Sequence, residues 1–110
     1  MSISASISAG VGSIPIINRR SMSPVNTDRP VLSGDFLVGT TATCSDGTWT
    51  NDPTEFSYQW YRDSREIPLA FMSTYLLMIL DRGTTISCLV TATNDFGSGD
   101  QFSDEVFITA

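Results

Sequence analysis

The stretch Phe56-Ser-Tyr-Gln-Trp-Tyr61 decides the fold, because aromatic and polar side chains alternate along it. A period of two places three aromatic side chains on one face, which is typical of a β-strand with one buried side. The same alternation recurs in Thr85–Asn94, where Ile86 and Val90 share a face. Turn residues separate such stretches at intervals of about 8–12 residues, and this pattern predicts an all-β sandwich.

Further strands are predicted on both sides of this stretch, and no segment shows a helical period with capping residues. Only Pro68–Leu80 is apolar over a length that fits either a strand or a helix. Asp81-Arg-Gly83 and Asp95-Phe-Gly-Ser-Gly99 are predicted turns. The predicted strands are residues 36–44, 56–61, 65–67, 74–80, 85–94 and 102–108.

Five motifs occur in a fixed order: Val38-Gly-Thr-Thr41, Gly47-Thr-Trp49, Tyr58-Gln-Trp60, Asp81-Arg-Gly83, and Thr91-Ala-Thr-Asn94 with Gly97-Ser98. Trp60 follows Cys44 by 16 residues, and Cys88 follows Cys44 by 44 residues. Over about residues 31–109, these features resemble the immunoglobulin-like domains of bacterial and bacteriophage proteins. One position departs from the family, because Ile86 stands two residues before Cys88, where a tyrosine is usual.

The resemblance implies an immunoglobulin-like β-sandwich of about seven antiparallel strands with an extended N-terminal arm. Its core is expected to contain Trp60, Tyr58, Ile86 and Val90. Truncation of one buried aromatic side chain in such a core costs on the order of 3–5 kcal/mol. The core residues are therefore interpreted as structural and not as a ligand site.

Cys44 and Cys88 leave two alternatives open. A disulfide between them would close a long loop and add ~4 kcal/mol of stability. In a cytosol-like compartment the two thiols instead stay reduced and pack as small apolar groups.

Charge and aromatic content divide the chain near residue 34. The formal net charge of −6 separates into +2 for residues 1–34 and −8 for residues 35–110. All eleven aromatic side chains lie from Phe36 onward, so a core forms only in the second part. These shifts predict an N-terminal arm over residues 1–30 and one sandwich domain over residues 31–110.

Composition argues against catalysis, nucleic-acid binding and membrane insertion. The chain has no histidine, and all six of its basic residues are arginine, so the commonest general bases and metal ligands are missing. The acidic balance disfavours nucleic acid, and the longest apolar run, Tyr75–Leu80, is far too short to span a membrane. Asp46, Asp52 and Glu55 form a weak candidate calcium site. We expect no enzyme activity, no cofactor and no bound metal.

The arm carries an apolar pattern that it cannot bury alone. Ile3 and Ile7 alternate with serines, and Ile14, Ile16 and Ile17 precede Arg19 and Arg20. One interpretation is a tail, or an extra edge strand of the sandwich itself. The other is a docking arm that pairs with the sheet edge of another protein, where Arg19 and Arg20 would suit an acidic surface.

The resemblance implies a phage capsid decoration protein, or a similar virion surface protein, as the leading function. Expected partners are a major capsid or tail protein, further copies on the particle, and host-surface carbohydrate. Loop residues Trp49, Asn51, Asp95 and Phe96 are the expected outward contacts. The N-terminal residues lack the pattern of a secretory signal, so we expect assembly in the bacterial host cytoplasm and location in the virion. The alternatives are a tail or baseplate component and a module of a bacterial surface adhesin.

Overall fold

The computed structural model describes residues 7–9, 12–13 and 22–109. In this part of the chain the fold is all-β, every strand pair is antiparallel, and one short 3-10 helix, η2 (Ile79–Asp81), interrupts the strands. The prediction of an all-β fold with antiparallel strands is confirmed. Within the same residues, no helix has the length and apolar character needed to cross a membrane.

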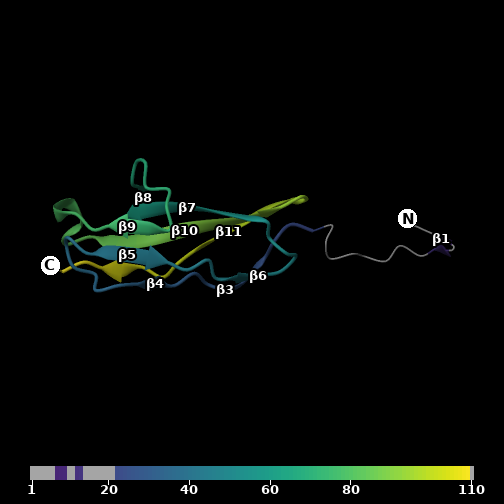
Figure 1. Ribbon diagram of the computed structural model, residues 1–110, viewed down its shortest axis with the longest axis horizontal. Coiled ribbons are helices and arrows are strands. Elements are labelled where there is room, and N and C mark those ends of the chain that lie inside the picture. The colour runs from purple at the N-terminus through teal and green to yellow at the C-terminus, as the bar shows by residue number, and fades with distance from the viewer. Residues whose placement is uncertain (1–6, 10–11, 14–21, 110) are drawn as a thin grey trace.

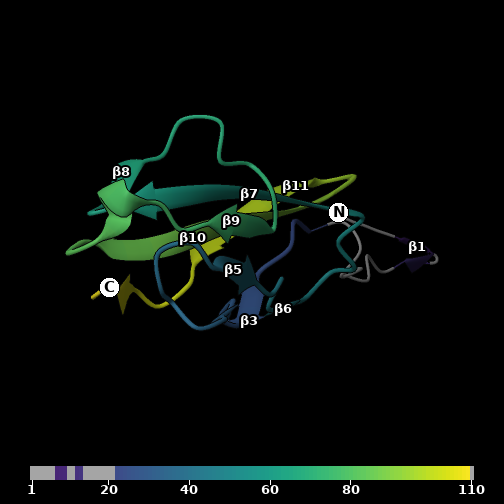
Figure 2. The ribbon, with the colours of Figure 1, turned by 60° about the vertical axis from the view of Figure 1, so that its left-hand side comes forward.

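Two sheets face each other in a sandwich-like arrangement (Figures 1 and 2). One sheet has the strand order β11-β10-β7-β8, with β12 paired to β10, and the other has the order β4-β5-β9. A separate two-stranded sheet pairs β3 with β6. The bounds are β3 (Asn26–Asp28), β4 (Leu32–Ser33), β5 (Thr41–Cys44), β6 (Thr48–Trp49), β7 (Glu55–Arg62), β8 (Arg65–Glu66), β9 (Thr74–Leu76), β10 (Thr85–Asn94), β11 (Gly97–Phe102) and β12 (Val106–Phe107).

The centre of the larger sheet is the pairing of β7 with β10. Eight residue pairs join them, from Ile86 opposite Arg62 to Thr93 opposite Glu55. This register sets Cys88 opposite Trp60, so both side chains enter the space between the sheets. The alternation along both strands explains this burial, because every second residue faces the other sheet.

Side chains from both sheets make up the core. Trp60, Cys88 and Val90 come from the larger sheet, and Ala42, Cys44 and Tyr75 come from the smaller one; all six are buried. Trp60 stacks on Tyr75 with 5.5 Å between ring centroids, and its indole nitrogen donates a hydrogen bond to the Met72 carbonyl at 2.7 Å. The one polar atom of the central tryptophan is therefore satisfied.

The four residues expected in the core differ in their burial. Trp60, Ile86 and Val90 are fully enclosed. Tyr58 is half-buried and packs against the core, while its hydroxyl reaches outward and donates a hydrogen bond to the carboxylate of Asp46. The apolar side chain of Ile86 is fully buried at the position where the sequence departs from the domains that it resembles.

Several elements have bounds that differ from those the sequence predicts. Residues 36–40 do not extend β5, because Phe36 has a φ of 58° and the next residues turn, with Thr40 N–H bonded to the Leu37 carbonyl. The predicted strand 74–80 ends at Leu76 and gives way to η2. The predicted loop Asp95–Gly99 is mostly strand, since β11 begins at Gly97.

Residues 22–30, which the sequence assigned to the arm, lie against the sandwich. Strand β3 pairs with β6, and Pro30 is fully buried. Two glycines let this segment approach closely: a Cβ on Gly47 would lie 2.5 Å from the Asp28 carbonyl oxygen, and one on Gly99 would lie 2.2 Å from that of Pro24. Backbone contacts hold the segment here. The content of aromatic residues, which predicts the boundary between arm and domain, gives no sign of such contacts.

In the arm, the structure describes β1 (Ile7–Ala9) and β2 (Gly12–Ser13), which pair with each other. The register sets Ile7 opposite Ser13. The other arm residues expected to dock, Ile3, Ile14, Ile16, Ile17, Arg19 and Arg20, lie outside the described residues.

Candidate interaction surface

Large apolar side chains stand exposed along the segment from residue 69 to residue 80. The chain from Ile67 to Leu80 carries no charged residue. Seven of its apolar residues are between 48% and 85% exposed, and we call them together the 69–80 surface: Leu69, Phe71, Met72, Leu76, Met78, Ile79 and Leu80. Clustered exposed apolar residues of this size mark an interaction site on a folded protein.

Strand β9 orients one part of the 69–80 surface. Tyr75 and Leu77 point into the core, so the alternating residues Leu76 and Met78 point outward. Strand β9 lies at the edge of its sheet and pairs only with β5 among the described strands. An edge strand with exposed apolar side chains offers main-chain and side-chain contacts to a partner.

The β8–β9 connection carries the other part of the 69–80 surface and rises from the sandwich in Figures 1 and 2. It begins with a turn over Ile67–Ala70, in which Ala70 N–H bonds the Ile67 carbonyl at 3.2 Å. Pro68 and Leu69 occupy the central positions, and Leu69 has a φ of 65°. This is the geometry of a type II turn, whose third position usually takes glycine.

Hydrogen bonds to the core fix this connection in place. Trp60 N–H bonds the Ala70 carbonyl at 3.0 Å, and Cys44 N–H bonds the Ser73 carbonyl at 2.8 Å. The side-chain amide of Gln59 donates to the Ile67 carbonyl at 2.8 Å. A hollow of about 300 Å³ lies between the connection and β9, lined mainly by apolar residues that include Leu69, Phe71 and Leu76. The surface is therefore held in one shape by the buried core beneath it.

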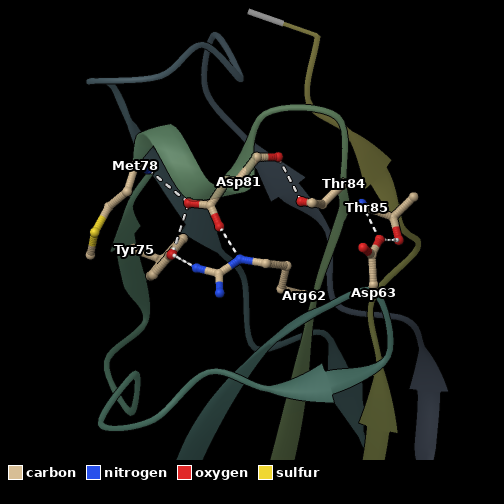
Figure 3. Close-up of polar contacts among 7 residues, drawn as sticks. All are labelled: Arg62, Asp63, Tyr75, Met78, Asp81, Thr84 and Thr85. Carbon is tan, nitrogen blue, oxygen red and sulfur yellow. Dashed lines mark hydrogen bonds and ion pairs between the residues drawn. The ribbon is translucent and has the colours of Figure 1, made fainter.

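A buried ion pair supports the last part of the surface, η2 (Figure 3). Asp81 has no exposed area, and its carboxylate accepts hydrogen bonds from Arg62 Nε at 2.6 Å, from the Tyr75 hydroxyl at 2.8 Å and from Met78 N–H at 2.7 Å. The Asp81 carbonyl accepts a further bond from the Thr84 hydroxyl at 2.6 Å. Each carboxylate oxygen has a partner within the protein, so this group positions η2 and offers no open place to a substrate.

The electrostatics around Asp81 follow from its burial. Burial raises the pKa of Tyr75, and the hydrogen bond to Asp81 raises it further. Burial is the largest single influence on Arg62 and opposes its charge, but the hydrogen bonds to Asp81 and Tyr75 and the negative charge of Asp81 together outweigh burial and raise the pKa of the guanidinium. Arg62 therefore stays charged and Tyr75 stays neutral at neutral pH, as their hydrogen bonds require.

Cys44 and Cys88 are both buried and both free thiols. They come from β5 and β10, so one belongs to each sheet. A hydrogen bond between the two thiols raises the pKa of Cys88 and burial raises it further, while the same hydrogen bond lowers the pKa of Cys44. The two thiols lie close enough in the core for each to shift the pKa of the other.

The four expected outward contacts lie near the place where the chain enters the sandwich, and they divide by role. Asp95 and Phe96 are exposed at the turn between β10 and β11. Trp49 and Asn51 are half-buried and hold the incoming chain. Trp49 donates to the Asp46 carbonyl at 2.7 Å, and Asn51 donates to the Ser23 carbonyl at 2.9 Å.

Four exposed carboxylates gather near the same place, and we call them the acidic end: Asp52, Glu55, Asp95 and Asp100. Strand register and hydrogen bonds bring them together, because Glu55 pairs with Thr93 and the Asn94 side chain bonds the carbonyls of Met22 and Asn51. The weak calcium candidate is not assembled: within the residues that the structure describes, no group of three or more Asp, Glu, Cys or His side chains is placed to hold a metal. Asp46 is instead bonded to Tyr58.

The sequence does not predict the 69–80 surface, although the apolar stretch that forms it is visible there. The segment from Pro68 to Leu80 is apolar without strict alternation, and it was interpreted as a strand or helix. Comparisons of the chain with protein-family models, with curated proteins and with solved structures find no match. A function therefore has to be inferred from the residues and geometry of the chain itself.

Proposed function

We propose that the chain is a non-enzymatic structural protein of a virus particle, a capsid decoration protein built on an immunoglobulin-like sandwich. The sheet orders support the family assignment in part: β11-β10-β7 with the edge strand β8 correspond to one sheet of that fold with an added strand, and β4-β5-β9 correspond to three of the four strands of its other sheet. Cys44 and Cys88 on facing sheets, with Trp60 opposite Cys88, support it further. The motifs of the sequence supply the link to phage proteins.

The single observation that carries an attachment role is the contrast between the two ends of the sandwich. The chain enters at the acidic end, where the Met22 carbonyl bonds the Asn94 side chain. The segment η2 and the 69–80 surface lie toward the opposite end (Figure 1). A protein with an arm at one end and an apolar surface toward the other is suited to joining larger bodies, since each end meets a different partner.

In this proposal the arm docks on the major capsid protein, and the sandwich stands on the particle. The apolar residues Ile3, Ile14 and Ile16 supply the buried contact, and Arg19 and Arg20 supply charge that complements an acidic surface. Because Asp95 and Phe96 lie at the end where the arm enters, contacts to host-surface carbohydrate are proposed instead for the surfaces of the sandwich that face away from the particle. Many copies on one shell would strengthen such weak contacts by avidity.

Particle binding tests the docking of the arm. Virus particles from a strain with this gene disrupted are mixed with the full chain, with a variant lacking residues 1–21, or with Arg19→Glu/Arg20→Glu, and bound protein is measured after sedimentation. We expect the deletion to abolish binding and the charge reversal to weaken it about tenfold at low salt. Arg82→Glu, which reverses an exposed charge on the sandwich, is the matched control and is expected to bind normally.

The copy number separates decoration from a role in the tail. Mass spectrometry of purified particles is expected to find this chain in a simple ratio to the major capsid protein. A ratio matching the few copies of tail proteins would favour the baseplate alternative. Full binding of the variant without residues 1–21 would exclude the arm as the anchor.

A further inference from the structure

We propose that the 69–80 surface joins two copies of this chain, with each copy presenting the same surface to the other in a symmetric dimer. This contact is separate from the proposed docking of the arm, because the arm enters at the acidic end. Four observations support a second copy as the occupant: the area, the backbone at Leu69, the free strand edge, and the charge distribution.

The area fits an interface between proteins. Seven large apolar residues, each about half or more exposed, offer an area on the order of the 800 Å² that each partner buries in a standard interface. The hollow of about 300 Å³ beside Leu69 gives the surface both a projection and a recess. A symmetric contact needs both, because a projection on one copy has to fit a recess on the other.

The backbone at Leu69 takes a conformation that disfavours a bulky residue, and no contact inside the molecule compensates for it. Leu69 sits in the left-handed region at a turn position that favours glycine, yet its side chain is 85% exposed and contributes nothing to the core. A bulky residue in that region is strained, and such strain is typical of binding sites. A leucine that carries this strain in full contact with water is explained if a partner covers it.

The free edge of β9 adds a polar contact to the apolar one. Strand β9 has β5 on one side and no strand on the other among the described elements. Two copies related by a two-fold axis bring two β9 edges together antiparallel, which is the pairing that every strand in the described sandwich uses. The exposed side chains of Leu76 and Met78 then lie at the contact.

The charge distribution favours a second copy over a strongly charged partner. The segment from Arg62 to Arg82 contains the 69–80 surface and is electrically neutral, since three arginines balance Asp63, Glu66 and Asp81. The acidic end, by contrast, has four carboxylates exposed. Two acidic domains therefore meet at low electrostatic cost only through their neutral surfaces, which keeps the acidic ends and the arms apart.

The mass of the purified full chain in solution tests the dimer. Sedimentation equilibrium over a wide range of concentration is expected to give twice the chain mass at high concentration. Phe71→Ser is expected to raise the dissociation constant of the dimer by about tenfold or more. Phe96→Ser is the matched control, because Phe96 is 56% exposed against 58% for Phe71 but lies at the acidic end; it is expected to leave the dimer unchanged.

Leu69→Gly provides a second variant that keeps the fold. Glycine suits the φ of 65°, so the turn is retained while the projecting side chain is lost, and the dimer is expected to weaken as for Phe71→Ser. A chain that is monomeric at all concentrations would overturn the proposal. So would association that survives both variants but disappears when residues 1–21 are deleted, since the arm would then be the occupant. None of these results depends on particle binding, so the proposed function is tested separately.

Discussion

Asp81 shows how a single charged residue shapes the surface around it. Its carboxylate is completely buried and accepts three hydrogen bonds, one of them from the charged side chain of Arg62. Because Asp81 is fully buried and only a quarter of the Arg62 side chain is exposed, removal of the carboxylate charge leaves a largely buried guanidinium without its partner. Met78 and η2 both depend on this carboxylate for their position, so part of the 69–80 surface depends on it as well.

We expect Asp81→Asn to destabilise the fold by on the order of 3–5 kcal/mol, because the amide cannot balance the charge of Arg62. The measurement is urea unfolding followed by tryptophan fluorescence. Asp63→Asn is the control, since the exposed Asp63 carboxylate accepts bonds only from Thr85, and its loss is expected to cost about 1 kcal/mol. Equal losses for the two variants would contradict the structural role assigned to Asp81.

The sequence does not reveal the burial of Asp81. Asp81-Arg-Gly83 predicts a turn, and an aspartate in a turn is usually exposed. The partner Arg62 lies 19 residues away, and only the fold brings its guanidinium to Asp81. Trp60 is different, because its place on an alternating strand is a local property that the sequence shows directly.

At the scale of elements, the sequence predicts the long strands well and the short ones poorly. The strands β7 and β10 have long alternating patterns, and the structure forms both over nearly the predicted residues. Residues 36–40 belong to the predicted strand and their exposure alternates too, but Phe36 takes a left-handed conformation and the chain turns before β5. Alternation over a few residues cannot distinguish a strand from an extended loop that packs on the core, and Val38 packs there from the loop.

The turn before β9 gives a prediction about conformation. Leu69 has a φ of 65°, where a side chain branched at Cβ is strongly disfavoured and glycine is not. We therefore expect Leu69→Val to lower the free energy of unfolding by about 1 kcal/mol and Leu69→Gly to leave it unchanged or slightly higher. Thermal unfolding of the dilute proteins is the measurement. A Leu69→Gly variant less stable than Leu69→Val would show that the backbone does not hold this geometry.

At the scale of the whole molecule, the sequence shows how much negative charge the domain carries but not that part of it lies at one end. The count of −8 for residues 35–110 follows from composition, whereas the gathering of Asp52, Glu55, Asp95 and Asp100 follows from strand pairing. For a related reason, composition does not indicate the attachment of residues 22–30 to the sandwich. Backbone pairing of β3 with β6 attaches residues 26–28 to the sandwich, and backbone hydrogen bonds leave little trace in composition.

The two cysteines join the halves of the molecule, and their redox state gives a prediction at this scale. Oxidation of the folded protein is expected to form one intramolecular bond between Cys44 and Cys88 and to raise stability by about 4 kcal/mol. Intact mass and urea unfolding with and without reductant are the measurements. Cys44→Ala is the control and is expected to show no response to oxidant. Intermolecular disulfides, or an oxidised chain no more stable than the reduced one, would contradict the facing geometry.

The short pairing of β3 with β6 has a mechanical consequence for a tethered protein. A pull applied along the arm reaches residues 22–30 before it reaches the core, and only two residue pairs join β3 to β6. The Asn94–Met22 and Asn51–Ser23 side-chain bonds and the Arg29–Asp104 ion pair also hold this segment, and they take the load together with the two pairs before the eight pairs between β7 and β10 do. The nine released residues would span at most roughly 30 Å when extended, which includes the distance that they already cover in the fold. The segment thus acts as an extensible link that yields before the sandwich unfolds.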